Sequence, residues 1–373
     1  MKKLKKHVFI ITLVFFSSLL NAAEIPFELI DGKIIVPVSI KKEKHNFIFD
    51  SGAFTIISSE LKNRLNEKKV NTIFEGIDAN NAKSSMEVFS TNTLQLSDMN
   101  IKNVSFSFAD IGWMSGRACR KISGIFGANM MKDKIWRIDF TNKKITVFEK
   151  VQLQNTNASV IPFSEENFTH VPKINAKVRN QNIEFIFDTG SGMGFSVNQK
   201  SYDLIKDDHF LTFEGLLSQS LNSISKGQRF LDMMEVEINN VKLGSHIIDS
   251  SSDAPNLIGI RFIENYLVDL DFISKKIILS SINKNPEYKS FGISLAPVEN
   301  TVVIVSKLQI PELSELNLTE KIVRVNDFDV SALKENTFCE LKNIMDSSET
   351  ITLENASGKK FTLQKTNVLQ HLY

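Results

Sequence analysis

The chain contains two nearly identical heptapeptides, FIFDSGA at residues 47–53 and FIFDTGS at residues 185–191. In each of them an acid, Asp50 or Asp188, ends an apolar run with the character of a buried strand, and a hydroxyl residue and a glycine follow at once. A carboxylate that leaves a strand interior must be desolvated or shared with another group. Two such acids in one chain therefore predict one shared site.

The heptapeptides belong to a longer internal repeat. FEGI at residues 74–77 recurs as FEGL at 213–216, so Gly76 and Gly215 follow the two acids at nearly the same distance. Two later motifs recur in the same order: GIFG at 124–127 with LIG at 257–259, and IDFTNKKI at 138–145 with LDFISKKI at 270–277. A chance similarity between two short motifs would not preserve this spacing. We therefore expect two copies of one strand-rich unit, residues 24–150 and 151–284.

Residues 1–23 have a different character from the repeat. Lysines precede an apolar stretch over residues 8–20, and the small residues Ala22 and Ala23 follow it. This order is typical of a secretory signal peptide, and the apolar stretch is short for a membrane span. We expect an exported protein, periplasmic or secreted, with no membrane span after signal removal; the alternative is an uncleaved membrane anchor.

Composition excludes few functions but narrows the partners. The chain has 373 residues, more than one hydrophobic core usually serves, with 42% hydrophobic and 23% charged residues. A net charge of +1 with scattered acids and bases gives no reason to expect a nucleic-acid partner.

Cys119 and Cys339 are interpreted as packing residues, with a disulfide open as the alternative. The six histidines have no metal-ligand spacing, so we expect neither a metal nor a cofactor.

Each copy of the repeat carries half of a carboxylate pair. The economical arrangement is a pseudo-two-fold dimer within one chain, which brings Asp50 and Asp188 together at the axis. The alternative is two independent units with one acid each. Asp139 and Asp271 are also in register, but each precedes a turn sequence, so we interpret them as structural residues of hairpin corners.

On these motifs the repeat resembles the retropepsin-like and pepsin-like aspartic peptidases, specifically bacterial exported members with both lobes in one chain. The matched features are the two Asp-Ser/Thr-Gly triplets and the later apolar-apolar-Gly elements at residues 125–127 and 257–259. The resemblance covers roughly 260 residues. It implies a mainly β fold with two retropepsin-like β-barrel lobes, and a monomer that is an internal pseudo-dimer.

The same resemblance implies the roles of the site residues. Asp50 and Asp188 would share one proton, as aspartic peptidases do in general, and activate a water for peptide-bond hydrolysis. The supporting catalytic loop would comprise Ser51, Gly52, Thr189, Gly190, Gly127 and Gly259. Its hydroxyls would bond across the axis, and its glycines would allow backbone to approach closely. The segments around Gly76 and Gly215 would form mobile flaps.

From residue 285 the repeat ends and a new pattern begins. Three strand-like segments, a predicted helix over residues 336–345 and a closing hairpin follow. Residues 285–373 thereby resemble a PDZ domain, although Thr319 and Glu320 stand where that family usually has a Gly-Asp turn. The resemblance implies a C-terminal peptide ligand, added as a strand and received by a loop that comprises Lys289, Ser290, Phe291 and Gly292. The alternative is a small β domain that only packs on the repeat.

These observations favour an exported, metal-independent aspartic endopeptidase that acts on peptides or proteins. The alternative is a catalytically silent peptide-binding protein that uses the same two sites. Both Asp-Ser/Thr-Gly triplets are intact, which favours catalysis. A purely structural envelope protein would explain neither the duplicated acids nor their spacing.

Overall fold

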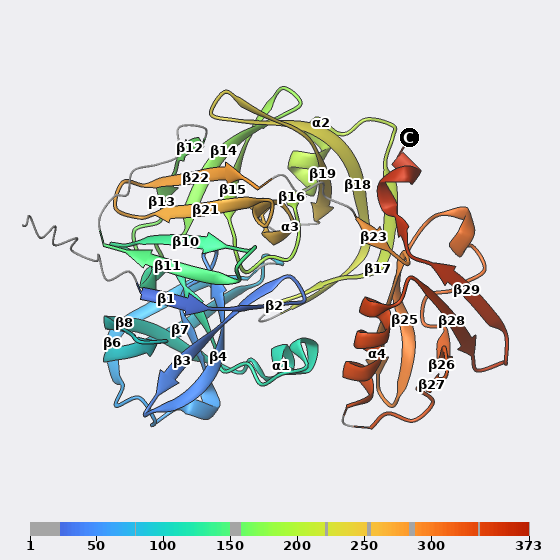
Figure 1. The fold of residues 1–373 in the computed structure, drawn as a ribbon, viewed down its shortest axis with the longest axis horizontal. Coiled ribbons are helices and arrows are strands. Elements are labelled where there is room, and N and C mark those ends of the chain that lie inside the picture. Colours follow the sequence, from blue (N-terminus) through green and yellow to red (C-terminus); the bar gives the residue numbers. More distant parts are fainter. Residues whose placement is uncertain are drawn as a thin grey trace, which may run out of the picture.

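The structure, a computed structural model, describes residues 23–78, 80–149, 158–220, 223–251, 255–282, 288–334 and 336–372. The predicted signal peptide lies outside these ranges except for its last residue. The described chain is mainly β, as predicted (Figure 1). No helix in the described ranges has the length and apolar character needed to cross a bilayer.

The first half of the chain forms an eight-stranded sheet in the order β2-β3-β4-β9-β5-β8-β7-β6. Its strands are β2 (Glu28–Ile30), β3 (Lys33–Ile40), β4 (Glu43–Asp50), β5 (Ile56–Ser58), β6 (Lys68–Ile77), β7 (Lys83–Leu96), β8 (Met99–Ala109) and β9 (Gly124–Gly127). The short helices are η1 (Ser59–Leu61), α1 (Gly112–Ala118) and η2 (Ala128–Met130). The pairs β4–β9 and β5–β8 are parallel, whereas the hairpin pairs are antiparallel.

The second half repeats this order strand for strand, as β13-β14-β15-β20-β16-β19-β18-β17. The strands are β13 (Ser164–Glu165), β14 (Pro172–Val178), β15 (Gln181–Phe187), β16 (Phe195–Asn198), β17 (Leu211–Gln219), β18 (Ile224–Ile238), β19 (Val241–Ser251) and β20 (Leu257–Ile258), with helices α2 (Gln199–Ile205) and α3 (Ile260–Ile263). The pairs β15–β20 and β16–β19 are again parallel. The repeat in the sequence is thus a repeat of topology.

The strands that end in the acids are held by buried aromatic side chains. Phe47 and Phe49 of β4 and Phe185 and Phe187 of β15 are fully buried. The Phe49 ring lies 5.5 Å from the ring of Trp136, which is also fully buried. Large aromatic side chains contribute most of the contact area in a core. The apolar residues before each acid therefore fix where its strand ends.

A six-stranded sheet joins the halves, in the order β1-β11-β10-β21-β22-β12. Its strands are β1 (Ala23–Pro26), β10 (Ile135–Asp139), β11 (Lys144–Phe148), β12 (Ser159–Pro162), β21 (Tyr266–Asp271) and β22 (Lys276–Ser281). In Figure 1 this sheet lies on the side away from the C-terminal region.

The two halves meet at the centre of this sheet, where Arg137 of β10 pairs with Asp269 of β21. The two residues precede the same repeated motif, so equivalent positions of the repeat face each other. Arg137 donates two hydrogen bonds to the Asp269 carboxylate, at 2.7 and 2.8 Å. Identical residues would repel or fail to pair here. Divergence of the two copies allows a bidentate ion pair, the stronger kind of charged hydrogen bond.

The acids of the predicted hairpin corners do have structural roles. Asp139 accepts hydrogen bonds from the backbone and side chain of Asn142. Asp271 accepts from the backbone amides of Ile273 and Ser274. The interpretation of both acids as turn residues is confirmed.

The C-terminal region is a small α+β unit. It contains β23 (Lys289–Ser290), β24 (Ile293–Val298), β25 (Thr301–Leu308), η3 (Pro311–Leu313), β26 (Lys321–Val325), β27 (Phe328–Asp329), α4 (Thr337–Ser347), β28 (Thr350–Asn355), β29 (Lys360–Gln364), β30 (Thr366–Asn367) and η4 (Val368–Leu372). Helix α4 matches the predicted helix, residues 336–345, except that Asn336 is the N-cap residue and the helix continues to Ser347. The hydrophobic core of this unit also includes Leu211 of β17, because β17 pairs with β25 and continues the sheet of the second half. Figure 1 shows β17 extending to β25.

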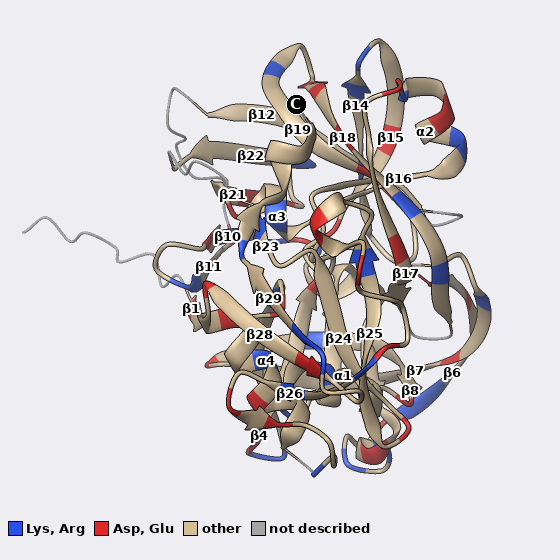
Figure 2. Cartoon of the chain, turned by 90° about the vertical axis from the view of Figure 1, so that its right-hand side faces the viewer, with Lys and Arg blue, Asp and Glu red and all other residues tan. Residues whose placement is uncertain are grey.

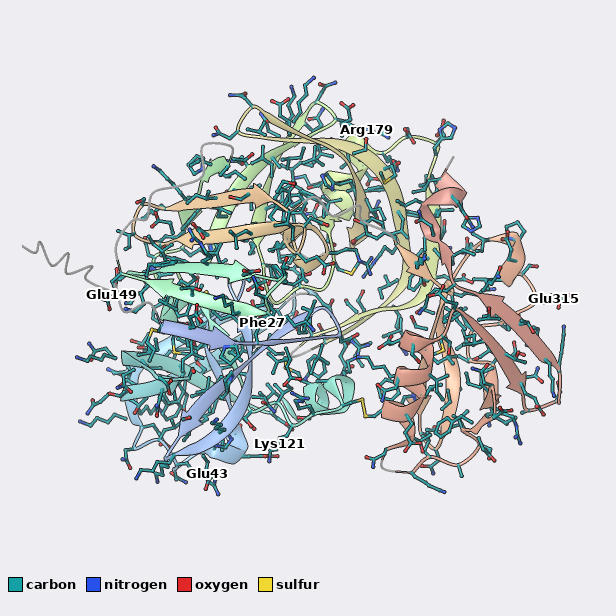
Figure 3. All side chains as sticks on the ribbon, viewed as in Figure 1. Phe27, Glu43, Lys121, Glu149, Arg179 and Glu315 are labelled. Atoms are coloured by element: carbon teal, nitrogen blue, oxygen red, sulfur yellow. A yellow bond between two sulfur atoms is a disulfide. The ribbon has the colours of Figure 1, made fainter. Side chains whose placement is uncertain are left out.

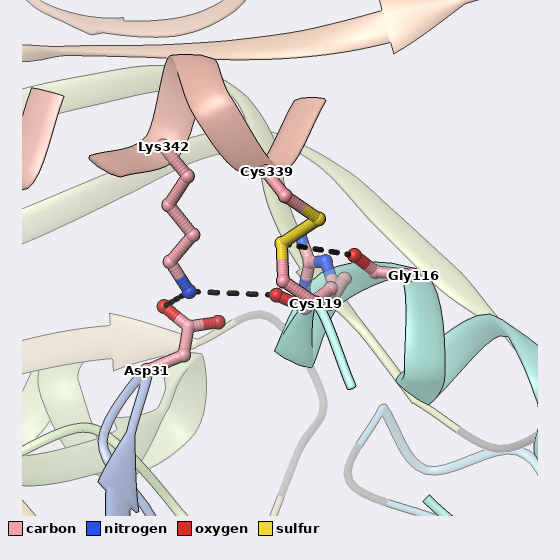
Figure 4. The surroundings of a disulfide bond; sticks show 6 residues. Asp31, Gly116, Cys119, Cys339 and Lys342 are labelled. Atoms are coloured by element: carbon pink, nitrogen blue, oxygen red, sulfur yellow. Dashed lines mark hydrogen bonds and ion pairs between the residues drawn. A yellow bond between two sulfur atoms is a disulfide. The ribbon is translucent and has the colours of Figure 1, made fainter. Parts of the chain in front are cut away.

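Cys119 and Cys339 form a disulfide, so their interpretation as packing residues is wrong. Cys119 directly follows α1 and Cys339 lies in α4, with 5.5 Å between the Cα atoms (Figures 3 and 4). Nearby, the Lys342 ammonium of α4 lies 3.2 Å from the Asp31 carboxylate in the turn after β2. The C-terminal region is therefore attached to the first half covalently and to the second half by strand pairing.

We expect the double variant Cys119→Ser with Cys339→Ser to have a Tm about 5–10 °C lower than the oxidised protein. The disulfide joins residues 220 positions apart, and its removal frees the unfolded chain from a long closed loop. Calorimetry of the variant and of the oxidised wild type measures the difference, and reduced wild type controls for the substitutions themselves. Equal Tm values in all three samples would show that the link contributes nothing.

Candidate active site

Asp50 and Asp188 lie together, at the ends of two strands from different halves. Asp50 ends β4, and Asp188 directly follows β15. A Cβ atom added to Gly52 would lie 2.5 Å from Asp188 Cγ, and one added to Gly190 would lie 2.1 Å from Asp50 Oδ2. Each glycine of the repeated triplet therefore lies against the carboxyl group of the opposite half, and a side chain at either position would displace an acid.

Ser51 and Thr189 hold the two loops together with reciprocal hydrogen bonds. The Ser51 amide donates to Thr189 Oγ1 at 2.9 Å, and the Thr189 amide donates to Ser51 Oγ at 3.0 Å. Each hydroxyl also donates to a backbone carbonyl of the opposite strand, Ser51 to Phe187 at 2.6 Å and Thr189 to Phe49 at 2.9 Å. Both side chains are fully buried. Since every donor is matched, these bonds form without an unsatisfied polar group.

Backbone amides of the same loops orient the carboxyl groups. The Gly52 amide donates to Asp50 Oδ1 at 2.8 Å, and the Gly190 amide donates to Asp188 Oδ1 at 2.7 Å. The Ser191 amide adds a further bond to Asp188 Oδ1 at 3.1 Å. One oxygen of each acid is thereby fixed by its own loop.

The pKa of Asp50 is raised well above its ordinary value. Burial is the largest cause, and the charge of Asp188 and a hydrogen bond between the two carboxyl groups raise the pKa further. The positive charge of Lys33 and the Gly52 amide act in the opposite direction. The protonated form of Asp50 is therefore favoured, as expected for two acids that cannot both ionise easily at close range.

Gly127 and Gly259 lie under the two loops. A Cβ atom on Gly127 would lie 2.5 Å from the Ala53 carbonyl oxygen, and one on Gly259 would lie 2.5 Å from the Met193 carbonyl oxygen. Gly127 is the last residue of the short strand β9, and Gly259 directly follows the short strand β20. These two strands pair in parallel with β4 and β15, which lead to the acids. The structure thus places all six residues of the predicted supporting loop around Asp50 and Asp188.

Gly76 and Gly215 lie in two long hairpins, β6–β7 and β17–β18. The hairpins contact each other near their tips: Ser220 Oγ donates to Asp78 Oδ2 at 2.6 Å, and Asn80 Nδ2 donates to Ser220 Oγ at 3.1 Å. The second hairpin is also bound to the C-terminal region. Gly215, with φ +108°, lies opposite Ser306 of β25, and a Cβ atom on it would lie 2.2 Å from the Val305 carbonyl oxygen.

Two features near the acids could not be recognised in the sequence. The first is Lys33, whose Nζ donates a hydrogen bond to the Gly190 carbonyl. The second is a cluster of three aromatic rings, in which Phe54 lies 4.9 Å from Phe74 and 5.2 Å from Phe168. Phe54 follows the first triplet, but Phe168 comes from the other half. Local sequence gives no sign of contacts between halves.

The residues of the predicted peptide-receiving loop lie at the start of the C-terminal region. Lys289 and Ser290 form β23, which pairs with β30, and Phe291 is buried in the core of the unit. The Gly292 amide donates to Ser290 Oγ at 3.0 Å, and its carbonyl accepts from the Leu308 amide at 2.7 Å.

In the part of the chain that the structure describes, no group of three or more His, Cys, Asp or Glu side chains is arranged so that it could hold a metal ion. Figure 2 shows Lys and Arg interspersed with Asp and Glu along the chain.

Comparison with known proteins gives one family match. The model of the family described as aspartyl protease matches residues 36–130, which include Asp50 and Gly127. An aspartic proteinase from Irpex lacteus is similar in structure, with a TM-score of 0.45 and 12% sequence identity, over 70% of this chain and 98% of that chain. No curated protein matches the sequence. The family match supports an aspartyl protease-like fold.

The raised pKa of Asp50 predicts how stability changes with pH. An acid whose pKa is raised by folding stabilises the protein fully below its unfolded pKa, and this contribution is lost as pH rises through the folded pKa. As the pH rises from about 4 to about 8, the Tm of the wild type should therefore fall further than the Tm of Asp50→Asn, because the Asn side chain cannot ionise.

Asp139→Asn is the matched control for this measurement. Burial alone would raise the pKa of Asp139, but hydrogen bonds from Asn142 outweigh it, and the net pKa is lowered. Ionised Asp139 therefore stabilises the protein above the unfolded pKa of the acid. The Tm of Asp139→Asn should lie furthest below the Tm of the wild type at neutral pH. Parallel Tm curves for wild type and Asp50→Asn would contradict the proton assignment at the site.

Proposed function

We propose that this chain is an aspartic endopeptidase that hydrolyses peptide bonds with a water activated between Asp50 and Asp188. The observation that carries the proposal is the pair of carboxyl groups, each set against the glycine of the opposite half. The reciprocal bonds of Ser51 and Thr189 add to this support, because they fix the pair without involving the carboxyl oxygens.

In this proposal the two acids divide the work of one reaction. The ionised acid accepts a proton from the water, and the protonated acid donates to the carbonyl oxygen under attack. The raised pKa of Asp50 favours a pair that holds one proton. The residues at the site would need no cofactor and form no covalent intermediate.

We further propose that the halves are two retropepsin-like lobes in a pseudo-two-fold arrangement. The repeated strand order and the pairing of equivalent residues Arg137 and Asp269 support this. A peptide substrate would then lie between the acids and the two hairpins, whose tips meet through Asp78 and Ser220. The substrate would enter after these tip contacts open.

The proposal also includes export and a PDZ-like C-terminal module. The disulfide supports export, because disulfides persist mainly in oxidising compartments outside the cytosol. For the PDZ-like module, the support is the position of β24, which pairs with β25 on one edge and with no other described strand. A peptide could add to that free edge as a further strand.

A catalytically silent peptide-binding protein is the second candidate. The pairing of β17 with β25 supports this candidate, because it attaches the second hairpin to the C-terminal region as well as to the hairpin of the first half. A binding protein would retain the fold and the paired acids, but hydrolysis would not occur.

Single substitutions of the acids separate the two candidates. Asp50→Asn and Asp188→Asn are each expected to lower the hydrolysis rate by about 100-fold or more, since each acid performs half of one proton transfer. Digestion of a mixed peptide library, analysed by mass spectrometry, measures this with and without a chelator. Wild-type activity should be highest at acidic to mildly acidic pH.

Asp139→Asn, which alters an acid outside the site, should keep wild-type activity in the same assay. Hydrolysis that persists in either site variant would reject a single shared site. Binding of library peptides by the wild type without any cleavage would identify the binding protein instead.

A further inference from the structure

Lys33 places a positive charge beside the paired acids. Its ammonium donates a hydrogen bond to the Gly190 carbonyl, and Gly190 is the residue that lies against the Asp50 carboxyl group. Lys33 belongs to the first half, whereas Gly190 belongs to the catalytic loop of the second half. The bond is thus a contact between halves at the site itself.

A tight turn delivers Lys33 to this position. Asp31 and Gly32 both have positive φ, 53° and 64°, and join β2 to β3 with Ile30 paired to Lys33. Hairpins whose two strands are joined by a two-residue loop favour the sequence Asp-Gly in that loop. A Cβ atom on Gly32 would lie 2.9 Å from the Cα atom of Gly192, so the turn touches the second catalytic loop.

The C-terminal region holds the same turn from the other side. The Lys342 ammonium of α4 lies 3.2 Å from the Asp31 carboxylate and donates to the Arg117 carbonyl at 3.4 Å (Figure 4). Since Asp31 is paired with Lys342, the carboxylate two residues before Lys33 already has a cationic partner. The turn is therefore fixed by strand pairing, by the loop of the second half and by α4.

On the opposite side of the site, the corresponding position has an aromatic contact. Gly192 follows Asp188 at the distance at which Phe54 follows Asp50, and Gly192 contacts the turn that carries Lys33. Phe54 instead contacts Phe168, from the loop before β14, with 5.2 Å between the rings. One side of the pair is therefore cationic and the other aromatic, although the two halves share one topology.

The charges near the acids balance in one protonation state. The charged groups that act on Asp50 are Asp188 and Lys33, and Asp31 and Lys342 form a pair of their own beyond the turn. With one proton on the two acids, their single negative charge is matched by the Lys33 ammonium. A site with no net charge costs least to keep out of water.

We propose that Lys33 is a positioning residue of the acid pair: its ammonium holds Gly190 against Asp50 and places a positive charge beside the two carboxyl groups. The inference rests on the proposed function for its meaning in catalysis, but its effect on the acids is measurable without a substrate. Lys33 acts through Gly190 and Asp50 and is assigned no contact with the reacting atoms.

The test is a carbon-13 NMR titration of the Asp carboxyl groups in the full chain, with Asp50→Asn and Asp188→Asn used to assign the signals. Removal of the charge in Lys33→Met should raise the titration midpoints of the pair by about one pH unit. Lys33→Gln, which can still donate to the Gly190 carbonyl, should shift them equally, and Lys33→Arg should keep them near wild type. Lys44→Met removes an exposed lysine from β4 and should shift nothing.

The variants distinguish an effect of the Lys33 charge from an effect of its hydrogen bond, and both effects from the proposed peptidase activity. Unchanged midpoints in Lys33→Met and Lys33→Gln overturn the inference, and so does a Gln variant that titrates like wild type. If the Met variant does not fold, the Gln and Arg variants still compare a neutral with a charged donor. Shifted midpoints in a protein without peptidase activity support Lys33 and reject the proposed function; in an active protein, the pH–activity profile should move upward with the midpoints.

Discussion

The structure depends on one set of contacts, the reciprocal hydrogen bonds between the loops of Ser51 and Thr189. Each residue donates from its amide to the hydroxyl of the other and from its hydroxyl to a backbone carbonyl of the opposite strand. Both side chains are fully buried, so loss of either would leave unsatisfied donors and acceptors in the interior. Because these bonds require the loops to meet, they also bring two acids into contact that would otherwise remain hydrated. The hydrogen bonds of Ser51 and Thr189 therefore offset the free energy that it costs to bring two carboxyl groups together in a buried site.

The C-terminal region is connected to this centre from both halves. Its disulfide and Lys342 hold α1 and the Asp31 turn of the first half, while β25 pairs with the long hairpin of the second half. The turn carries Lys33 to the acids, and the hairpin reaches Asp78 of the opposite hairpin. A region outside the repeat thus contacts both elements that border the site, which gives the C-terminal region a physical route to influence it.

The sequence predicts most of the site but not its asymmetry. Alignment of the two copies of the repeat identifies equivalent positions, and apolar periodicity places the acids at strand ends. These two signals are enough to find Asp50, Asp188 and the glycines. Arg137 and Asp269 could be aligned, but not recognised as partners, because facing strands of different halves leave no local signal. The same limit applies to Lys33, Phe168 and the disulfide. Asp31-Gly32 predicts a tight turn, yet which loop that turn touches is a property of the assembled halves.

The proposed reaction requires that two aspartates, one from each copy of the repeat, form a single proton-sharing pair. Carboxyl titration of wild type beside Asp188→Asn tests it most directly, because coupled acids lose their protons in two separate macroscopic steps. A shared proton should give two well-separated steps in the wild type. In Asp188→Asn, Asp50 should titrate in a single step, at lower pH than the second wild-type step. An Asp50 signal with the same midpoint in both proteins would contradict it.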